Sequence, residues 1–118
     1  MRYLCLVYFE PGKLAALSRS DDAKLTNESI AYDEELERGG TYITSQALKS
    51  VEEAKTVRVR NGAMSTTDGP SAETKEVLGG FIMIDAPDLS AALRIAAGIP
   101  LAKIGSIEVR PILELRKT

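Results

Sequence analysis

Charged side chains gather in one short stretch, residues 66–81, which reads TTDGPSAETKEVLGGF. Asp68, Glu73, Lys75 and Glu76 stand between an Asp-Gly-Pro turn and a Gly-Gly pair. A carboxylate on an apolar strand end has a raised pKa and can serve as a general acid or base, whereas a nearby lysine opposes that rise. This stretch is therefore the first candidate for chemistry in the chain.

Asp68 cannot close the usual turn on itself. The carboxylate of an Asx turn accepts a hydrogen bond from the amide two residues on, and that residue is Pro70, which has no N–H. We expect the carboxylate to find Ser71, a backbone amide or Lys75 instead. The predicted site has three catalytic residues, Asp68 (general acid or base), Lys75 and Glu73, and three substrate-binding residues, Arg58, Ser71 and Glu76.

The same stretch also fits a short helix without catalytic meaning. Ser71 would be its N-cap, Glu73 would lie in its first turn and Gly79 would end it, so that Lys75 and Glu76 are solvated. The phosphate-binding patterns GxxxxGK[ST] and GxGxxG are absent, so the Gly-Gly pair is not expected to cradle a phosphate. Local sequence features are compatible with both interpretations, a functional site and a short helix.

The chain contains no histidine and a single cysteine, Cys5, which lies in the apolar run YLCLVYF. These counts exclude Ser-His-Asp triads and His-ligated zinc sites, and they make Cys5 a buried hydrophobe rather than a nucleophile. We therefore predict no metal and no cofactor. Proton chemistry falls to carboxylates, lysine or tyrosine.

The net charge and the length of the apolar segments limit the classes of partner that we expect. The 118 residues carry 15 basic and 17 acidic side chains, a net charge of -2, which gives no electrostatic case for nucleic acid or for an anionic membrane. The N-terminal apolar run stops at Glu10 and Pro11, too short for a signal peptide or a membrane span. We expect a cytoplasmic protein with no membrane partner.

Periodicity predicts alternating strands and helices. A strand at 3–9 is apolar on both faces, and a helix at 21–38 aligns Leu25, Tyr32 and Leu36. A second helix begins at its N-cap Asp88, ends at Gly98, and has Leu89, Ala92, Leu93 and Ala96 as its predicted core stripe. Further strands are predicted at 41–48, 80–86 and 106–115, the last with Ile107, Val109, Leu113 and Leu115 on one face.

A β-hairpin is the clearest local signal. Asn61-Gly62 between two alternating runs is typical of a type I′ turn, because both turn positions need positive φ. Pairing Arg60 with Ala63 places Val57, Val59, Met64 and Thr66 on one face and Arg58 and Arg60 on the other. A continued ladder brings Asp68 onto the more apolar face.

The order β-α-β, hairpin, loop, β-α-β predicts one α+β domain over residues 1–118 with a ferredoxin-like split βαβ sandwich and an inserted hairpin. Two helices cover only one face of such a sheet. Leu4, Leu6, Tyr8 and one side of 81–84 would remain on the other, more apolar surface than soluble monomers expose. We therefore expect a homodimer with two sheets packed face to face, a dimeric α+β barrel.

The run VRVRNGAMSTTDGPSAETKEVLGGFIMIDAPDL, followed by GSIEVRPI, resembles the DGPF-domain group of the YCII-related bacterial proteins. The opening MRYLCLVYFE and the DEELERGG helix end are also similar. The resemblance implies a small ferredoxin-like dimer of a family encoded near extracytoplasmic-function sigma factors. It also implies a His–Asp pair in a dimer cleft. This chain lacks the histidine, so Asp68 is the matching residue, and Ser71 stands where the motif name calls for phenylalanine.

Two functions follow as hypotheses. The first is a cofactor-free enzyme, of hydrolase, isomerase or lyase type, acting on a small polar molecule, with Lys75 or Arg58 orienting an anionic group. The second is a non-catalytic ligand-binding or regulatory module in a transcription pathway. An RNA-recognition domain shares the topology, but GGFIMI lacks the second aromatic and the basic residue that such a domain needs.

Overall fold

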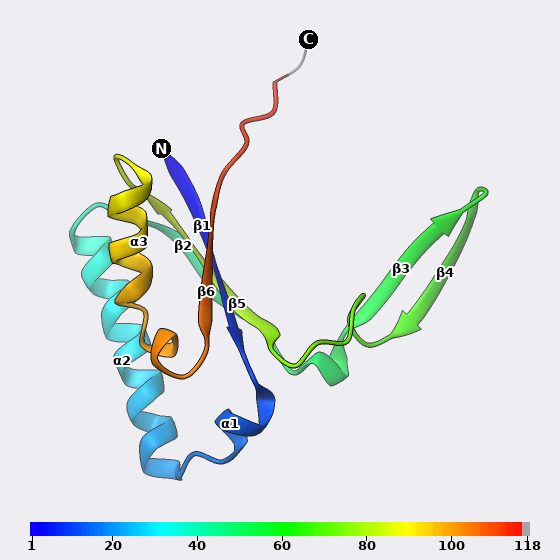
Figure 1. Cartoon of the computed structure of the whole chain (residues 1–118), viewed down its shortest axis with the longest axis horizontal. Helices are drawn as coiled ribbons and strands as arrows, with labels where there is room; N and C mark the ends of the chain where they lie inside the picture. The colour runs from blue at the N-terminus through cyan, green and yellow to red at the C-terminus, as the bar shows by residue number, and fades with distance from the viewer. Residues whose placement is uncertain (117–118) are drawn as a thin grey trace.

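A four-stranded sheet carries helices on one side and a projecting hairpin on the other (Figure 1). The computed structural model describes residues 1–116. Its elements in chain order are β1 (Arg2–Phe9), α1 (Pro11–Ala15), α2 (Arg19–Arg38), β2 (Tyr42–Ala47), the 3₁₀ turn η1 (Val51–Glu53), β3 (Lys55–Arg60), β4 (Ala63–Asp68), β5 (Val77–Asp85), α3 (Leu89–Ala97), the 3₁₀ turn η2 (Pro100–Lys103) and β6 (Ser106–Pro111).

The large sheet has the strand order β2-β5-β1-β6, and all of its pairings are antiparallel. In each half of the chain the helix links two strands that are not neighbours, so β5 lies between β1 and β2, and β1 lies between β5 and β6. This is the split βαβ arrangement that the sequence predicts, with β3 and β4 as the inserted hairpin.

The core lies between the sheet and the helices. Tyr3, Cys5 and Val7 point from β1 into it, and Ile82 and Ile84 point from β5, all of them buried. Leu36 of α2, Ala92 and Ala96 of α3, and Ile99 close this layer from the helical side. The alternate residues of β1 therefore face away from the helices, as expected for a strand that is apolar on both faces.

Helix α2 begins at Arg19, two residues before the predicted start, because the Ser18 hydroxyl caps it by accepting from the amide of Asp21 at 3.0 Å. Tyr32 and Leu36 pack against the core as predicted. None of the helices in residues 1–116 is long and apolar enough to cross a membrane.

Helix α3 has the predicted caps but a different buried stripe. The Asp88 carboxylate accepts from the amide of Ala91 at 2.8 Å, and Gly98 is the C-cap. Ala92 and Ala96 are buried, but Leu89 and Leu93 are each about half exposed. Ile95 completes the inward stripe of α3 instead, because positions 92, 95 and 96 share one helical face, and Ile99, just beyond the helix, packs into the same core.

Strand β6 ends at Pro111, so the prediction of a strand to residue 115 is wrong. The reason is a missing partner: Pro111 pairs with Tyr3, the amide of Ile112 donates to the carbonyl of Arg2 at 2.9 Å, and β1 starts there. Ile107 and Val109 pack on the core, whereas Leu113 and Leu115 are exposed beyond the strand.

The hairpin has the predicted turn and register. Arg60 pairs with Ala63, Val59 with Met64 and Val57 with Thr66. Asn61 and Gly62 have φ values of 51° and 77°, which is the left-handed conformation that the type I′ turn requires. The ladder continues to Lys55 and Asp68, so Asp68 does follow Met64 and Thr66 onto the same face.

Candidate functional site

The sheet face that the helices leave open is apolar along its centre. Leu4 pairs with Met83 and Leu6 pairs with Phe81, so the four side chains form one partly buried stripe. Polar residues of the outer strands flank this stripe on the same face, with Thr44 and Gln46 on β2 and Glu108 and Arg110 on β6. We call this surface the open sheet face.

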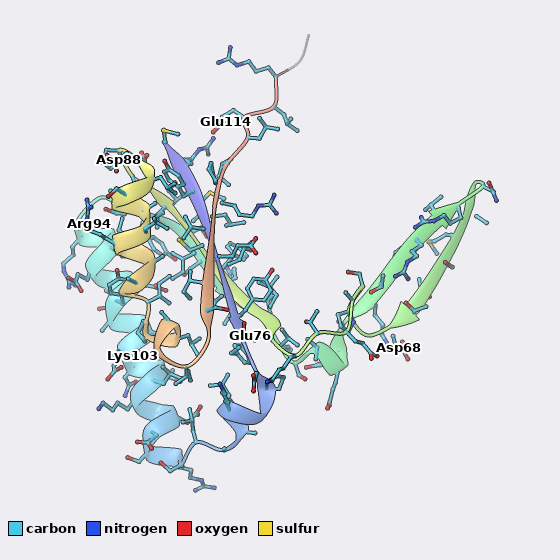
Figure 2. All side chains as sticks on the ribbon, in the orientation of Figure 1. Asp68, Glu76, Asp88, Arg94, Lys103 and Glu114 are labelled. Atoms are coloured by element: carbon cyan, nitrogen blue, oxygen red, sulfur yellow. The ribbon has the colours of Figure 1, made fainter. Side chains whose placement is uncertain are left out.

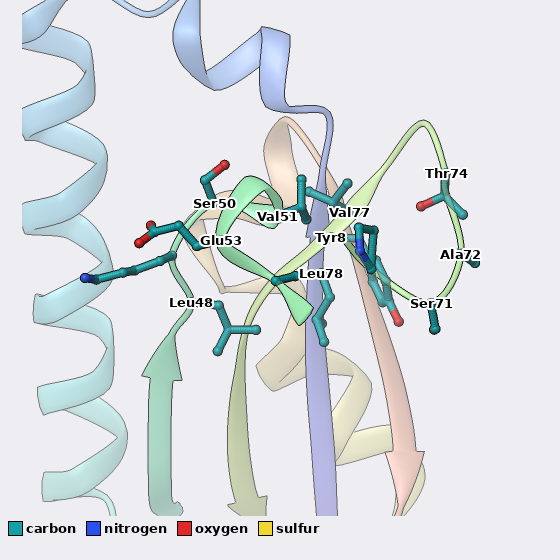
Figure 3. A pocket seen from close by; sticks show the side chains of 13 residues that line it. Tyr8, Leu48, Ser50, Val51, Glu53, Ser71, Ala72, Thr74, Val77 and Leu78 are labelled. Atoms are coloured by element: carbon teal, nitrogen blue, oxygen red, sulfur yellow. The ribbon is translucent and has the colours of Figure 1, made fainter. Parts of the chain in front are cut away.

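A cavity of about 610 Å³ lies at the end of the open sheet face, where β1 finishes and β5 begins (Figure 3). Its walls come from Tyr8, the η1 segment, the loop before β5, and Val77 and Leu78. The complete lining is Tyr8, Leu48, Lys49, Ser50, Val51, Glu53, Ala54, Pro70, Ser71, Ala72, Thr74, Val77 and Leu78. Apolar walls with a few hydroxyls are typical of small-molecule sites.

A β-bulge brings Tyr8 and Leu78, two of the sheet residues that line this cavity, together. Val7 pairs with Gly80 but Tyr8 pairs with Leu78, so Gly79 is an extra residue in β5. The ring of Phe9 fills the space beside Gly79, where a Cβ would lie only 1.9 Å from the ring. The Gly-Gly pair is thus required by close packing, since a Cβ on Gly80 would also lie 2.7 Å from the carbonyl oxygen of Gln46.

A second hollow of about 660 Å³ adjoins the first, and Tyr8 and Thr74 line both. It is the more charged of the two. Its lining is Tyr8, Glu10, Thr74, Lys75, Glu76, Ser106, Ile107 and Glu108. Tyr8 therefore separates an apolar compartment from a charged one, and its phenol is the titratable group that the two compartments share.

The charged loop contains no helix, so the short-helix interpretation of residues 71–79 is wrong. Its charges instead attach the loop to three other parts of the chain. Asp68 Oδ1 lies 2.6 Å from Lys55 Nζ, and Lys75 Nζ lies 3.4 Å from Glu10 Oε1. The Ser106 hydroxyl donates to Glu76 Oε1 at 2.7 Å.

The Asp-Gly-Pro turn closes the base of the hairpin. Gly69 has a φ of 94°, a conformation that favours glycine, and its amide donates to the carbonyl of Ala54 at 2.8 Å. Its own carbonyl accepts from the Thr56 hydroxyl at 2.7 Å. Ala54 and Pro70, on either side of the hairpin, both line the apolar cavity of about 610 Å³.

The predicted site residues fall into three groups. Ser71 lines the apolar cavity, and Lys75 and Glu76 line the charged hollow. Asp68 and Arg58 belong to the hairpin: the side chain of Asp68 is 86% exposed, and Arg58 contacts the Thr67 hydroxyl at 3.5 Å. Glu73 is exposed on the loop.

Asp68 and Lys75 do not meet in this chain, since each forms an ion pair with a different residue. The carboxylate found Lys55 rather than Ser71, a backbone amide or Lys75. Neither Asp68 nor Arg58 is among the residues that line the two cavities. Asp68 thus lies at the solvated end of a hairpin. Its pairing with Lys55 in the β3–β4 ladder fixes its position, and the loop that follows does not.

Of the cavity lining only Ser71 was predicted as a site residue, so Tyr8, Leu48 and Leu78 are among those that the sequence did not predict for the site. Figure 3 shows Tyr8 between Leu78 and the loop that carries Ser71, with Leu48 on the far side of Leu78. One signal was available for Tyr8: it carries a phenol on the uncovered side of a strand that is otherwise apolar. Leu48 and Leu78 gave no such signal, because apolar residues beside strands are ordinary.

Two titratable groups are perturbed by burial. Burial raises the pKa of the Cys5 thiol to about 11, so that this thiol is protonated and unreactive at neutral pH. Burial, and secondarily the charge of Glu35, raises the pKa of the Tyr32 phenol. Within residues 1–116 no group of three or more His, Cys, Asp or Glu side chains is placed to hold a metal ion.

Comparison with known proteins identifies the family. The YCII-related domain matches residues 1–116. The chain belongs to the YCII-related family. A relative from Rhizobium meliloti (strain 1021), described as an uncharacterised protein, is 33% identical over 95% of this chain and 92% of its own length.

A solved structure has the same fold. It is the 5-chloro-2-hydroxyhydroquinone dehydrochlorinase of Burkholderia phenoliruptrix AC1100, in complex with 2,5-dihydroxybenzoquinone. The similarity has a TM-score of 0.55 and covers 96% of this chain and 94% of that one, at 17% sequence identity. At this identity the likeness establishes the α+β fold alone.

Proposed function

We propose that this YCII-family chain acts on a small molecule bound in the cavity beside Tyr8. The observation that carries the proposal is the cavity itself, whose volume of about 610 Å³ lies within the range of about 300–1,000 Å³ typical of ligand sites. Its apolar walls suit a ring or short chain, and Ser50, Ser71 and Thr74 offer hydroxyls. An enzyme of the same fold that binds a small quinone supports this choice.

We further propose that the protein is a homodimer formed through the open sheet face. Leu4, Leu6, Phe81 and Met83 form an apolar stripe on the side opposite the helices, with polar residues at both edges. An apolar centre with a polar rim is the usual anatomy of a protein interface. The cavity lies at the end of this face, so a second copy packed there would add a further wall to it.

In the proposed chemistry no cofactor takes part, and Asp68 is the general acid or base for a substrate that extends from the cavity to the base of the hairpin, because Asp68 lies outside the cavity lining. Figure 2 shows Asp68 at the base of the hairpin, and in the sequence it lies two residues before Pro70 of the cavity wall. Lys75 lines the charged hollow and would hold an anionic group of the substrate in exchange for its ion pair with Glu10. Arg58 could do the same only for a molecule that reaches the hairpin.

The test is a binding and turnover screen by NMR on isotope-labelled protein. The first probe is 2,5-dihydroxybenzoquinone, followed by a set of small hydroxylated rings and acids. We expect a saturable ligand that shifts the resonances of Leu48 and Leu78. Ala72→Phe, which fills the cavity, should abolish binding, whereas Ala97→Phe on the exposed side of α3 should not. No saturable ligand in such a set would overturn the proposal.

Asp68→Asn then separates the enzyme from a ligand-binding module. The enzyme predicts that this variant keeps binding and loses turnover. Lys55→Gln is the matched control, because it breaks the same ion pair and leaves the carboxylate in place. Saturable binding without turnover in the wild-type protein would favour the regulatory module instead.

A further inference from the structure

The hairpin leaves the body of the domain as a separate arm. In residues 1–116, β3 and β4 hydrogen-bond to each other and to no other strand. The contacts at its base join the ends of its own two strands: Gly69 and Thr56 form the hydrogen bonds described above, and Lys55 pairs with Asp68. A two-stranded hairpin is at best marginally stable in water, so this one needs a surface to pack against.

One face of the arm is built for such packing. Val57, Val59 and Met64 are 58%, 59% and 71% exposed, and the register places them side by side. The Lys55–Asp68 ion pair closes the base of this patch, while the opposite face carries Arg58, Arg60, Ser65 and Thr67. We call the patch of Val57, Val59 and Met64 the apolar arm face.

We propose that the apolar arm face packs against a second copy of this chain, and that this contact fixes the wall of the cavity. The inference rests on the homodimer proposed above. Figure 1 shows the arm on the side of the sheet opposite α2 and α3, which is the side of the open sheet face. A copy seated on that face is therefore the body that the arm meets, and twofold symmetry makes both arms do the same.

The cavity connects the arm to function. Ala54 precedes the arm and Pro70 follows it, and both line the cavity. Docking of the arm thereby sets the position of two segments of the cavity wall, the one before Lys55 and the one after Asp68. In a monomer, this part of the wall would be connected to the domain body only through η1 and through the loop before β5, which Lys75 and Glu76 hold to Glu10 and Ser106.

A dye on each face of the arm tests the proposal. Met64→Cys and Ser65→Cys are adjacent and point to opposite faces. Cys5 is fully buried, so an environment-sensitive maleimide would label only the new thiol. We expect the dye at position 64, but not the one at position 65, to shift to the blue as the protein is concentrated from monomer to dimer.

Variants without a dye control for any effect of the dye itself on dimerisation. Val59→Asp should weaken dimerisation at least tenfold, while Ser65→Asp on the other face of the same arm should leave it within about twofold, since a charge is costly only where it is buried. A stable dimer in which neither dye responds and Val59→Asp is harmless would overturn the arm contact and leave the sheet dimer intact. Loss of both the dimer and these effects would overturn both.

Discussion

The ring of Phe9 occupies the space where a side chain at residue 79 would lie: a Cβ on Gly79 would be 1.9 Å from Cε1 of that ring. This contact lies at the bulge that pairs Tyr8 with Leu78, two residues that line the cavity. The Gly-Gly pair of the charged stretch is therefore a packing device that shapes the site, and its effect can be measured.

Gly79→Ala should lower the free energy of unfolding by about 1–3 kcal/mol, because the Phe9 ring must leave its place to admit the methyl group. Urea unfolding measures this directly. Gly12→Ala is the control, since nothing lies within 4 Å of a Cβ there. Equal stability of the two variants would show that Phe9 moves without cost.

Asp68→Asn should change stability by less than about 1 kcal/mol, because its ion pair with Lys55 is exposed on both sides. Lys55→Gln should have the same small effect. The measurement is thermal or urea unfolding of both variants. A loss of several kcal/mol would give Asp68 a structural role and would weaken its assignment as an acid or base.

Stability should fall between about pH 9 and pH 11 through Cys5, whose pKa burial raises from 9.0 to about 11. Over this range the thiol ionises in the unfolded chain while the folded chain still holds its proton, so alkali favours unfolding. The shift corresponds to about 2–3 kcal/mol. Relative to Cys5→Ala, the wild type should lose this amount; parallel pH curves would show that the thiol is not shielded.

Much of the fold was predictable because its signals are local. The hairpin register follows from Asn61-Gly62 alone, and the two apolar faces of β1 placed it at the centre of the sheet. Where tertiary partners decide, prediction failed: β6 stops at Pro111 because β1 offers nothing further to pair with. Tertiary packing also decides which residues of α3 are buried: Ile95 packs against the core, whereas Leu89 and Leu93 are about half exposed.

The site was less predictable than the fold. The loop that the sequence singled out borders both hollows, since Ser71 lines the apolar cavity and Lys75 and Glu76 line the charged hollow. The sequence could not foresee that Lys75 pairs with Glu10, because the two residues lie far apart in the sequence. It also missed Tyr8, because a bulge and two loops from distant parts of the chain create its surroundings. The narrower DGPF-type grouping stays a prediction based on the Asp-Gly-Pro run.

Leu6→Asp should disrupt the proposed dimer, because it places a charge in the middle of the open sheet face. Leu4→Asp tests the same layer at the neighbouring position. The matched control is Leu93→Asp, which is half exposed on α3 on the opposite side of the sheet. We expect the control to remain dimeric by size-exclusion chromatography, and a dissociated control would show that the effect is not specific to the open face.

The most direct test of the account is the mass of the wild-type protein in solution, measured by light scattering at tens of micromolar. Both proposals need a second copy: one to complete the cavity beside Tyr8, the other to cover the apolar arm face. The account predicts twice the chain mass of 12.7 kDa. A well-folded species of 12.7 kDa at that concentration would contradict it.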